Sequence, residues 1–407
     1  VKTLGFNITF YYLGLKFILN SKLLRILMKS TFILLCFLLF LSSVSGIDLS
    51  KLNTSYWYDP AAPLTIKSRV AQVSDTLNVF LSITYNPSDT IHTRLLIQTS
   101  YLDAIDQLLQ VYEIDTLEGT ADHLLLKFTF KEVSEKLLVL EFELAGAYYY
   151  YPINLKRGRL NHPQFYPLQT NGIPLISSFS ISSSLKFKSN HTQDTLYFFQ
   201  YKANFQPADP PMGVAQSVAS GLLMDSVFIS TQEVSLAQNH FYFIQSDTLS
   251  LEGLTLFMGP KYYPSMKLID ELIEPLTYFT SRSELDEIRN AKDPKIVFEN
   301  FWLNIHISPE AAGAAIRSYY RAIKKANELF TSYKEGWKTD RGMVYVIFGN
   351  PDRVFRENKK EIWLYGDIRF EFKIISNLFA PKMYVLLRDK GYEKIWIKKI
   401  TDLRSAL

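Results

Sequence analysis

Six side chains near the carboxyl end of the sequence have the chemistry to bind or transform a ligand. Two indoles, three carboxylates and one guanidinium fall within residues 337–363, where neighbouring loops and strands could bring them into one groove. Indole faces bind sugars or peptide side chains, and an arginine fork binds a carboxylate. The residues of this possible binding groove are Trp337, Asp340, Arg341, Asp352, Glu361 and Trp363.

The same stretch also fits a structural role, with an arginine–carboxylate pair buried beneath packed indoles, and we favour this interpretation. The glycine of Glu-Gly-Trp is expected to end a helix in the left-handed conformation, and the indole after it folds back onto the last turn. Thr339 and Asp340 then tie the reversal through backbone N–H groups, Gly342 opens a predicted strand, and Gly-Asn-Pro-Asp forms a turn. This structural motif comprises Gly336, Trp337, Thr339, Asp340, Gly342, Gly349 and Pro351.

No other pattern in the sequence points to a reaction. The six histidines are scattered, without a pair at i and i+4, and neither a nucleophile elbow nor a phosphate-binding glycine loop occurs. Ser183 and Lys186 match a Ser-x-x-Lys dyad in spacing, but they lie in a predicted strand, whereas the dyad needs a helix. Carboxylate pairs for glycoside hydrolysis stay open, because sequence does not give their separation. We therefore predict no catalytic, cofactor-binding or metal site.

The amino-terminal region has the features of an export signal. Met28 and Lys29 form a basic start, residues 31–41 are a continuous apolar run, and small residues lead to a cleavage position after Gly46. The run is too short to span a bilayer, so no stable transmembrane span is expected after cleavage. Residues 1–27 are interpreted as an upstream start that is not used; the alternative is that they lengthen the run into an anchor. The expected location is the periplasm or the cell exterior.

Composition narrows the chemistry of the exported part. Cys36 is the only cysteine and lies inside the apolar run, so the mature chain is expected to have no disulfide, thiolate metal site or cysteine nucleophile. The sequence has 407 residues, of which 47% are hydrophobic and 14% aromatic, which suits two or three globular domains. A formal net charge of +4 is small for this length and argues against a nucleic-acid partner.

The front half is predicted to be mainly β, with two antiparallel β-sandwich-like domains. Several segments alternate apolar and polar residues at period two, with turns between them. One such segment places on a single face Leu77, Val79, Leu81, Ile83 and Tyr85. The expected division of the chain is an unused region with the signal peptide at 1–46, sandwiches at 47–146 and 147–260, and a carboxyl-terminal domain at 261–407.

Four consecutive tyrosines at 148–151 lie near the boundary between the two sandwiches. They could form an exposed aromatic platform for sugar rings. The alternative, which we favour, is a strand whose rings pack on both of its sides.

The last third is predicted to be an α+β domain, with a long helix packed on an antiparallel meander sheet. Ser308 suits the helix cap, Pro309 the first helical position, and an apolar stripe continues to the Gly-Trp corner. Ser281 or Ser283 is expected to cap an earlier helix. Five strands are predicted after the corner, among them MVYVIFG and EKIWIKKI.

The motifs GWKTDRG, FGNPD and EIWLY, separated by apolar segments, resemble the GWxTD domain of bacterial exported proteins. The family usually has Tyr-Gly-Pro-Pro-Asp in the turn, where this sequence has Phe348 and Asn350. The resemblance implies the same layout, with a signal peptide, a β-rich front half and this domain at the carboxyl end, but it implies no established activity. The matching positions are Gly336, Trp337, Thr339, Asp340, Arg341, Gly342, Gly349, Pro351, Asp352, Glu361, Trp363 and Tyr365.

Three functions follow as hypotheses. The first is an exported, non-catalytic envelope protein that acts as an interaction or scaffold module, with an envelope or secreted protein as its partner and no cofactor. The second is a glycan or cell-wall binder, which requires the tyrosine run or the tryptophan groove to face solvent. The third is an envelope hydrolase, which requires a carboxylate or histidine cluster in one pocket.

Overall fold

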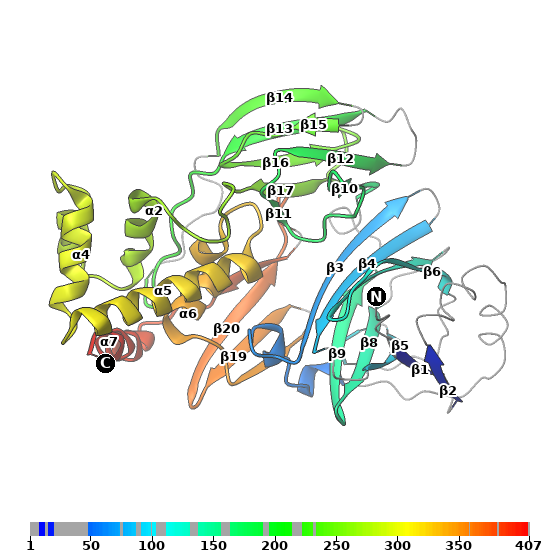
Figure 1. Ribbon diagram of the computed structural model, residues 1–407, viewed down its shortest axis with the longest axis horizontal. Helices are drawn as coiled ribbons and strands as arrows, with labels where there is room; N and C mark the ends of the chain where they lie inside the picture. Colours follow the sequence, from blue (N-terminus) through cyan, green and yellow to red (C-terminus); the bar gives the residue numbers. More distant parts are fainter. Residues whose placement is uncertain are drawn as a thin grey trace, which may run out of the picture. The chain divides into compact units, whose positions relative to one another are not determined.

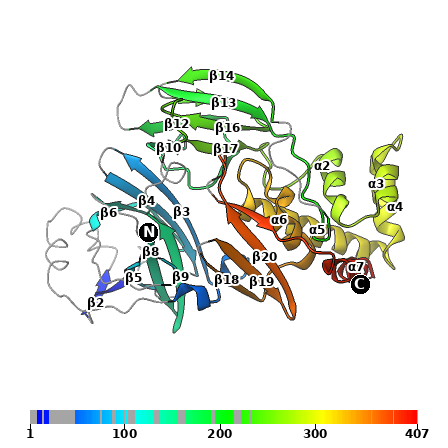
Figure 2. The same cartoon turned by 180° about the vertical axis from the view of Figure 1, so that it is seen from behind.

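The computed structural model describes most of the chain from residue 48 onward. Its internal contacts divide it into two compact units, Val1–Gln164 with Phe355–Asn358, and Phe165–Val354 with Lys359–Leu407 (Figures 1 and 2). The predicted signal peptide lies outside the described residues. Among those residues, no helix combines the length and apolar character needed to cross a membrane. The described residues are 8–12, 15–19, 48–73, 76–86, 91–98, 100–102, 111–130, 137–155, 163–189, 195–213, 222–230, 233–357, 359–380 and 382–405.

The described residues of the first unit form two sheets, with strand orders β2-β1-β5-β8-β9 and β3-β4-β7-β6. Every pairing between these described strands is antiparallel except that of β1 with β5. Its elements are β1 (Ile8–Tyr12), β2 (Leu15–Leu19), the 3-10 helices η1 (Leu49–Lys51) and η2 (Ser55–Trp57), β3 (Leu64–Val73), β4 (Thr76–Tyr85), β5 (Ile91–Gln98), β6 (Val111–Gly119), β7 (His123–Phe130), β8 (Leu137–Leu144) and β9 (Ala147–Asn154).

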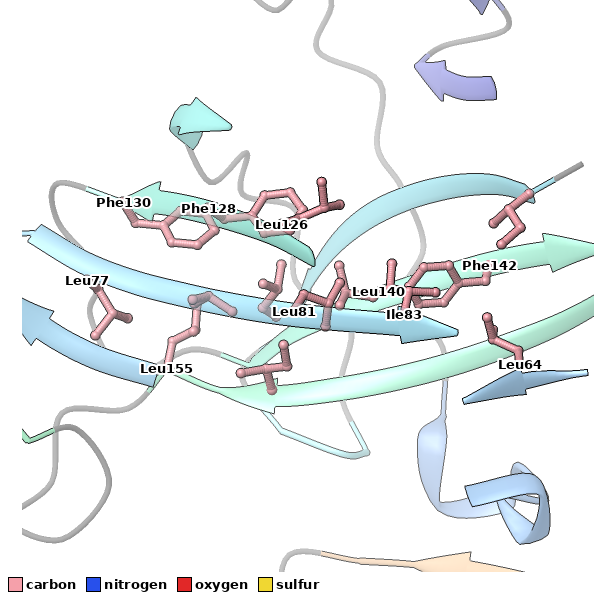
Figure 3. Close-up of a cluster of buried hydrophobic side chains, with 14 of the residues drawn as sticks. Leu64, Leu77, Leu81, Ile83, Leu126, Phe128, Phe130, Leu140, Phe142 and Leu155 are labelled. Atoms are coloured by element: carbon pink, nitrogen blue, oxygen red, sulfur yellow. The ribbon is translucent and has the colours of Figure 1, made fainter. Parts of the chain in front are cut away.

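The core of this unit contains side chains from both sheets (Figure 3). The face predicted for residues 77–85 lies in that core, which contains Leu77, Leu81 and Ile83 of β4. Burial does not alternate along the strand, because all five residues of Leu77–Leu81 are buried. From the other sheet, Leu140 and Phe142 of β8 join the same cluster. Burial of apolar area on the inner faces of both sheets is what holds such a sandwich together.

The four tyrosines lie on β9, an edge strand, and they divide between its two faces. Tyr149 and Tyr151 pack against the main core of the unit, and the Tyr151 ring makes an edge contact with Trp57. Tyr150 packs with a second apolar cluster on the other face. Only Tyr148 of the four is exposed, at 55%. The rings therefore pack on both sides of the strand, and one ring is left to solvent.

The second unit begins with another sandwich, built from sheets in the orders β10-β12-β15 and β11-β17-β16-β13-β14. Its core includes Phe165 and Leu185 from the smaller sheet and Phe198, Tyr242 and Leu256 from the larger one. The strands are β10 (Phe165–Leu168), β11 (Phe179–Ser180), β12 (Ser184–Ser189), β13 (Leu196–Lys202), β14 (Met224–Ser230), β15 (Glu233–Ser235), β16 (His240–Gln245) and β17 (Leu254–Met258).

Helices and most of a four-stranded sheet of order β18-β19-β20-β21 complete the second unit; the last two residues of β18 belong to the first unit. β19, β20 and β21 form the predicted antiparallel meander, so the predicted fold class is confirmed. The elements are α2 (Ile269–Ile273), η3 (Glu274–Tyr278), α3 (Arg282–Arg289), α4 (Pro294–Asn304), α5 (Pro309–Phe330), η4 (Gly336–Lys338), α6 (Asp340–Phe348), β18 (Arg353–Arg356), β19 (Lys360–Tyr365), β20 (Ile368–Ile375), β21 (Met383–Leu386) and α7 (Tyr392–Ser405).

Two strand predictions in this region are wrong. MVYVIFG forms most of helix α6, and Gly342 is therefore a helical residue rather than the start of a strand. The apolar side chains of α6 are buried on almost every side of the helix. A continuous apolar run in a sequence does not distinguish a buried strand from a buried helix. EKIWIKKI lies in helix α7, which buries Trp396.

The predicted helix caps are confirmed. The Ser308 hydroxyl accepts a 3.1 Å hydrogen bond from the Ala311 N–H at the start of α5, and Pro309 is the first helical residue. Ser281 caps α3, where its N–H donates to Glu284 and its hydroxyl accepts from the Glu284 N–H, forming a capping box.

Glu284 also joins α3 to α7 through a bidentate pair with Arg404, at 2.5 and 2.9 Å. The Arg404 hydrogen bonds lower the pKa of the Glu284 carboxyl from 4.5 to about 2. A lowered folded-state pKa stabilises the fold above the ordinary pKa, and this contribution is lost as the pH falls from about 5 towards 2.

We predict that Glu284→Gln lowers the free energy of unfolding by about 1 kcal/mol at pH 7, because solvent screens this partly exposed pair. The difference from the wild type should shrink as urea denaturation is repeated at decreasing pH from 5 towards 2. Glu287→Gln, at an exposed position of the same helix, is the matched control. An unchanged difference at low pH would contradict the assignment.

Candidate functional site

Two glycines allow three backbone segments to pack closely at the Gly-Trp corner, which comprises η4 and the start of α6. A methyl group on Gly336 would lie 2.0 Å from the carbonyl oxygen of Ala326 in α5. One on Gly342 would lie 1.9 Å from the carbonyl oxygen of Gly336. α5 ends at Phe330 rather than at the corner, and Gly336 is not among the described glycines with positive φ, so the predicted left-handed conformation is wrong. Both residues are glycine because only a hydrogen atom fits between these backbones.

Thr339 connects the two short helices of the corner. Its hydroxyl donates a 2.6 Å hydrogen bond to the Gly336 carbonyl and accepts a 3.0 Å bond from the Gly342 N–H. The same side chain thereby closes η4 and caps α6.

Thr339→Val keeps the shape of this side chain but removes both hydrogen bonds. We predict a loss of about 1–2 kcal/mol in the free energy of unfolding of the second unit, as for other lost helix caps. Urea denaturation followed by tryptophan fluorescence measures it. Thr339→Ser retains the hydroxyl and should lose much less; equal losses for the two variants would show that the hydroxyl is not what matters.

Trp337 is completely buried at the centre of the corner. Its backbone N–H donates to the side-chain oxygen of Asn327 at 3.2 Å, and its carbonyl accepts from the Tyr278 hydroxyl at 3.3 Å. Asn327 is itself fully buried and donates to the Pro264 carbonyl at 2.9 Å. These backbone hydrogen bonds join the corner to α5 and η3, and the completely buried indole has no face open to a ligand.

Charged side chains surround the corner next to Trp337. The Lys338 ammonium, only 4% exposed as a residue, lies 3.1 Å from Glu274 and 3.3 Å from Glu335. Burial raises the pKa of Glu335, whose buried Oε2 accepts no hydrogen bond from the described residues. Burial also lowers the pKa of Lys334 to about 8. Lys334 and Glu335 are thus the groups here whose pKa values are displaced towards neutrality.

Asp340 ties α6 to the end of the meander. Its carboxylate accepts hydrogen bonds from both terminal nitrogens of Arg388, at 2.6 and 3.1 Å, and from the Leu386 N–H at 2.7 Å. The two charged side chains are only 12% and 8% exposed. Arg388 also donates to the Asp209 carbonyl at 3.0 Å, in the segment that leads away from β13. A bidentate pair of this kind fixes geometry as well as charge.

Arg341, Glu361 and Trp363 form a second group of contacts beside α6. The Glu361 Oε1 atom accepts a 2.9 Å hydrogen bond from the Trp363 indole and lies 3.4 Å from the Arg341 guanidinium. Glu361 and Trp363 are completely buried. The guanidinium stacks 3.4 Å from the centre of the Tyr384 ring. This trio is therefore an internal tie, with both the carboxylate and the indole inaccessible.

Asp352 is not part of that trio. Its carboxylate accepts a 2.7 Å hydrogen bond from the Gly366 N–H and so holds the turn between β19 and β20. In the turn after α6, Gly349 has a φ of +76°, and Asn350 accepts a 2.6 Å hydrogen bond from the Tyr345 hydroxyl. Gly349 adopts the positive φ that glycine tolerates best.

The structure thus brings the six groove residues into separate contacts. Arg341, Glu361 and Trp363 are together, whereas Asp340 pairs with Arg388 and Asp352 supports a hairpin. The sequence interpretation missed Arg388, Asn327 and Lys338. A polar Asn327 beside the apolar stripe of α5 was the one local signal; the partners of Arg388 and Lys338 lie too far away in sequence to leave a pattern.

Among the described residues, no group of three or more His, Cys, Asp or Glu side chains could hold a metal ion. What the geometry defines is an α+β domain in which a Gly-Trp-Lys-Thr-Asp sequence locks the corner between helices α5 and α6. The family model of the GWxTD domain matches residues 240–405. The chain is therefore a GWxTD domain-containing protein, and the match begins within the sandwich, at the first residue of β16. No match to a curated protein was found.

Proposed function

We propose that the protein is an exported, non-catalytic envelope protein that acts as an interaction or scaffold module for an envelope or secreted protein. One observation carries the non-catalytic part of this proposal. The charged side chains at the Gly-Trp corner that could act as catalytic acids or bases pair with other side chains of the domain. Asp340 pairs with Arg388, and Glu361 pairs with Arg341 and Trp363. An exposed active site would need such groups turned towards a substrate.

Export is supported by the sequence alone, through the basic start at Met28, the apolar run and the small residues before Gly46. An envelope location also suits a protein whose expected mature part contains no cysteine, since its folding does not depend on the redox state of the compartment.

Crosslinking in intact cells tests this function. A photoreactive amino acid is placed at Leu249 or Ile307, which are 96% and 90% exposed, and the captured species are identified. Recovery of the same defined envelope protein with light, and its absence without light, is the expected result. Recovery of cytoplasmic proteins alone, or of no protein from either position, would contradict the proposal.

The two other hypotheses each have one observation in their favour. Tyr148 is the exposed ring that a glycan binder could use, although one ring is less than the four-ring platform that the tyrosine run could have formed. Lys334 and Glu335 have displaced pKa values, which a hydrolase could use. Turnover of a wall polymer or peptide by the purified chain, abolished by Glu335→Gln, would overturn the non-catalytic proposal.

A further inference from the structure

β14 is the outermost strand of its five-stranded sheet in both views of the molecule (Figures 1 and 2). Within the described part of the chain it pairs with β13 alone, so its second edge presents backbone groups that no described strand satisfies. Such an edge is a template for pairing with another strand.

The face beside this edge is apolar. Val227 is 45% and Ile229 60% exposed. They stand next to Phe199 and Tyr197 of β13, which are half-buried. The same face continues to Phe243 of β16, whose ring lies 5.5 Å from that of Phe379, in the loop between β20 and β21. The covered part of this face is an apolar interface inside the unit, and the part nearest β14 is its open continuation.

Between Ser226 and Ser230, β14 also lacks the devices that usually protect an edge. Among the other long edge strands described, β3 carries Lys67 and Arg69, β9 carries Pro152, and β6 carries several carboxylates. Asp225 is the only charged residue of β14, and it lies near one end, where it accepts a 2.8 Å hydrogen bond from Gln200. A register irregularity between β13 and β14 is confined to that same end.

The last five residues of β14 are symmetric about Phe228. Residues 226–230 read Ser-Val-Phe-Ile-Ser, which is the same sequence of residue types in either direction. If two copies of β14 paired antiparallel about Phe228, Val227 of each copy would lie opposite Ile229 of the other copy. It would also place Ser226 opposite Ser230. Asp225 of one copy would not lie opposite Asp225 of the other copy, so the pairing places no like charges opposite each other.

From this symmetry we infer that β14 pairs antiparallel with β14 of a second copy of the chain, about a twofold axis at Phe228. The inference rests on the proposed interaction function and names the partner as the protein itself. A twofold interface uses the same surface on both subunits, which requires a self-complementary patch of this kind. Pairing would join two five-stranded sheets into one continuous sheet and bring the apolar faces at Val227 and Ile229 together.

Sedimentation of the purified full-length chain over a range of concentrations tests the pairing. A concentration-dependent dimer is expected. Val227→Lys and Ile229→Glu each place a charge opposite an apolar side chain and should raise the dimer dissociation constant at least tenfold. Because both positions are exposed, the circular dichroism of the single variants should match the wild type, and so should their thermal unfolding at a concentration where every chain is monomeric.

The double variant Val227→Lys/Ile229→Glu distinguishes this register from other ways of dimerising. In the inferred register each introduced ammonium faces an introduced carboxylate, so dimerisation should return to within about threefold of the wild type; an equimolar mixture of the two single variants should also associate. Ser226→Lys/Ser230→Glu, on the opposite face of β14, is a second pair that should behave in the same way.

The inference is overturned if the wild-type chain stays monomeric at about 100 µM or more, an order-of-magnitude limit for a small strand interface. It is also overturned if both single variants still form the dimer, or if the double variant does not regain dimerisation. If the chain is monomeric but the same envelope protein is still captured in cells, the inference fails while the proposed interaction function stands.

Discussion

Gly342→Ala is expected to destabilise the second unit by about 4 kcal/mol or more. The added methyl group would lie 1.9 Å from the carbonyl oxygen of Gly336, and 2.8 Å from the Trp337 Cα atom. Both are backbone atoms of a buried segment, so no side-chain rotation can relieve the contact, and α6 and η4 must separate. Forced overpacking of this kind exceeds the usual range for a single added methyl group.

Urea denaturation followed by tryptophan fluorescence measures this change, because Trp302, Trp337, Trp363 and Trp396 all lie in the second unit and are buried. Gly313→Ala is the matched control. That glycine lies within α5, and its added methyl would approach only the end of the flexible Arg317 side chain, at 3.3 Å. It should be neutral or stabilising by about 0.5–1 kcal/mol, as alanine usually is in a helix. Similar losses for both variants would refute the close-contact explanation.

Asp340→Ala is expected to destabilise the same unit by about 3–5 kcal/mol. The substitution leaves the guanidinium of Arg388 buried without its carboxylate, and the Leu386 N–H without its acceptor. Removing one partner of a buried ion pair is costly because the remaining charge has lost both its solvent and its counter-ion.

The pair formed by Arg369 and Glu371 provides the control for this prediction. Its nitrogen–oxygen distance is 2.6 Å, the same as in the pair of Arg388 and Asp340, but its side chains are 54% and 26% exposed. Glu371→Ala should therefore change the free energy of unfolding by no more than about 0.5–1 kcal/mol. The double variant Asp340→Ala/Arg388→Met should recover part of the loss, since it removes the unpaired charge. Equal losses for Asp340→Ala and Glu371→Ala would contradict the role assigned to burial.

Local patterns in the sequence predicted those parts of the fold that local interactions determine. The cap at Ser308 and the apolar stripe located α5, and the period-two spacing in β4 identified the face that joins the main core of the first unit. Glu361 and Trp363 are two positions apart on β19, so strand geometry alone places them on one face. Their contact is the part of the candidate groove that spacing could predict.

The parts that could not be predicted depend on distant partners. The six consecutive buried residues of α6 have no periodicity, and their helix is determined by the Thr339 cap and by packing on α5. Arg388 is 48 positions from Asp340, and Lys338 is 64 positions from Glu274, so no spacing rule connects either pair. The partner of a charged residue determines whether that residue is available to a ligand or stabilises the fold. Because such partners can be distant in sequence, the role of the groove residues could not be assigned from their residue types.

The segment between β13 and β14 links the sandwich of the second unit directly to the Gly-Trp corner. Ala208 donates its N–H to the Lys338 carbonyl at 3.1 Å, the Pro211 carbonyl accepts from the Asp389 N–H at 3.1 Å, and Asp209 accepts from Arg388. A fragment that starts at residue 261 would lose all three contacts and would uncover the ring of Phe379. Genetic truncation or limited proteolysis at that position should therefore give an insoluble product, and the region from residue 165 onward should melt in one transition.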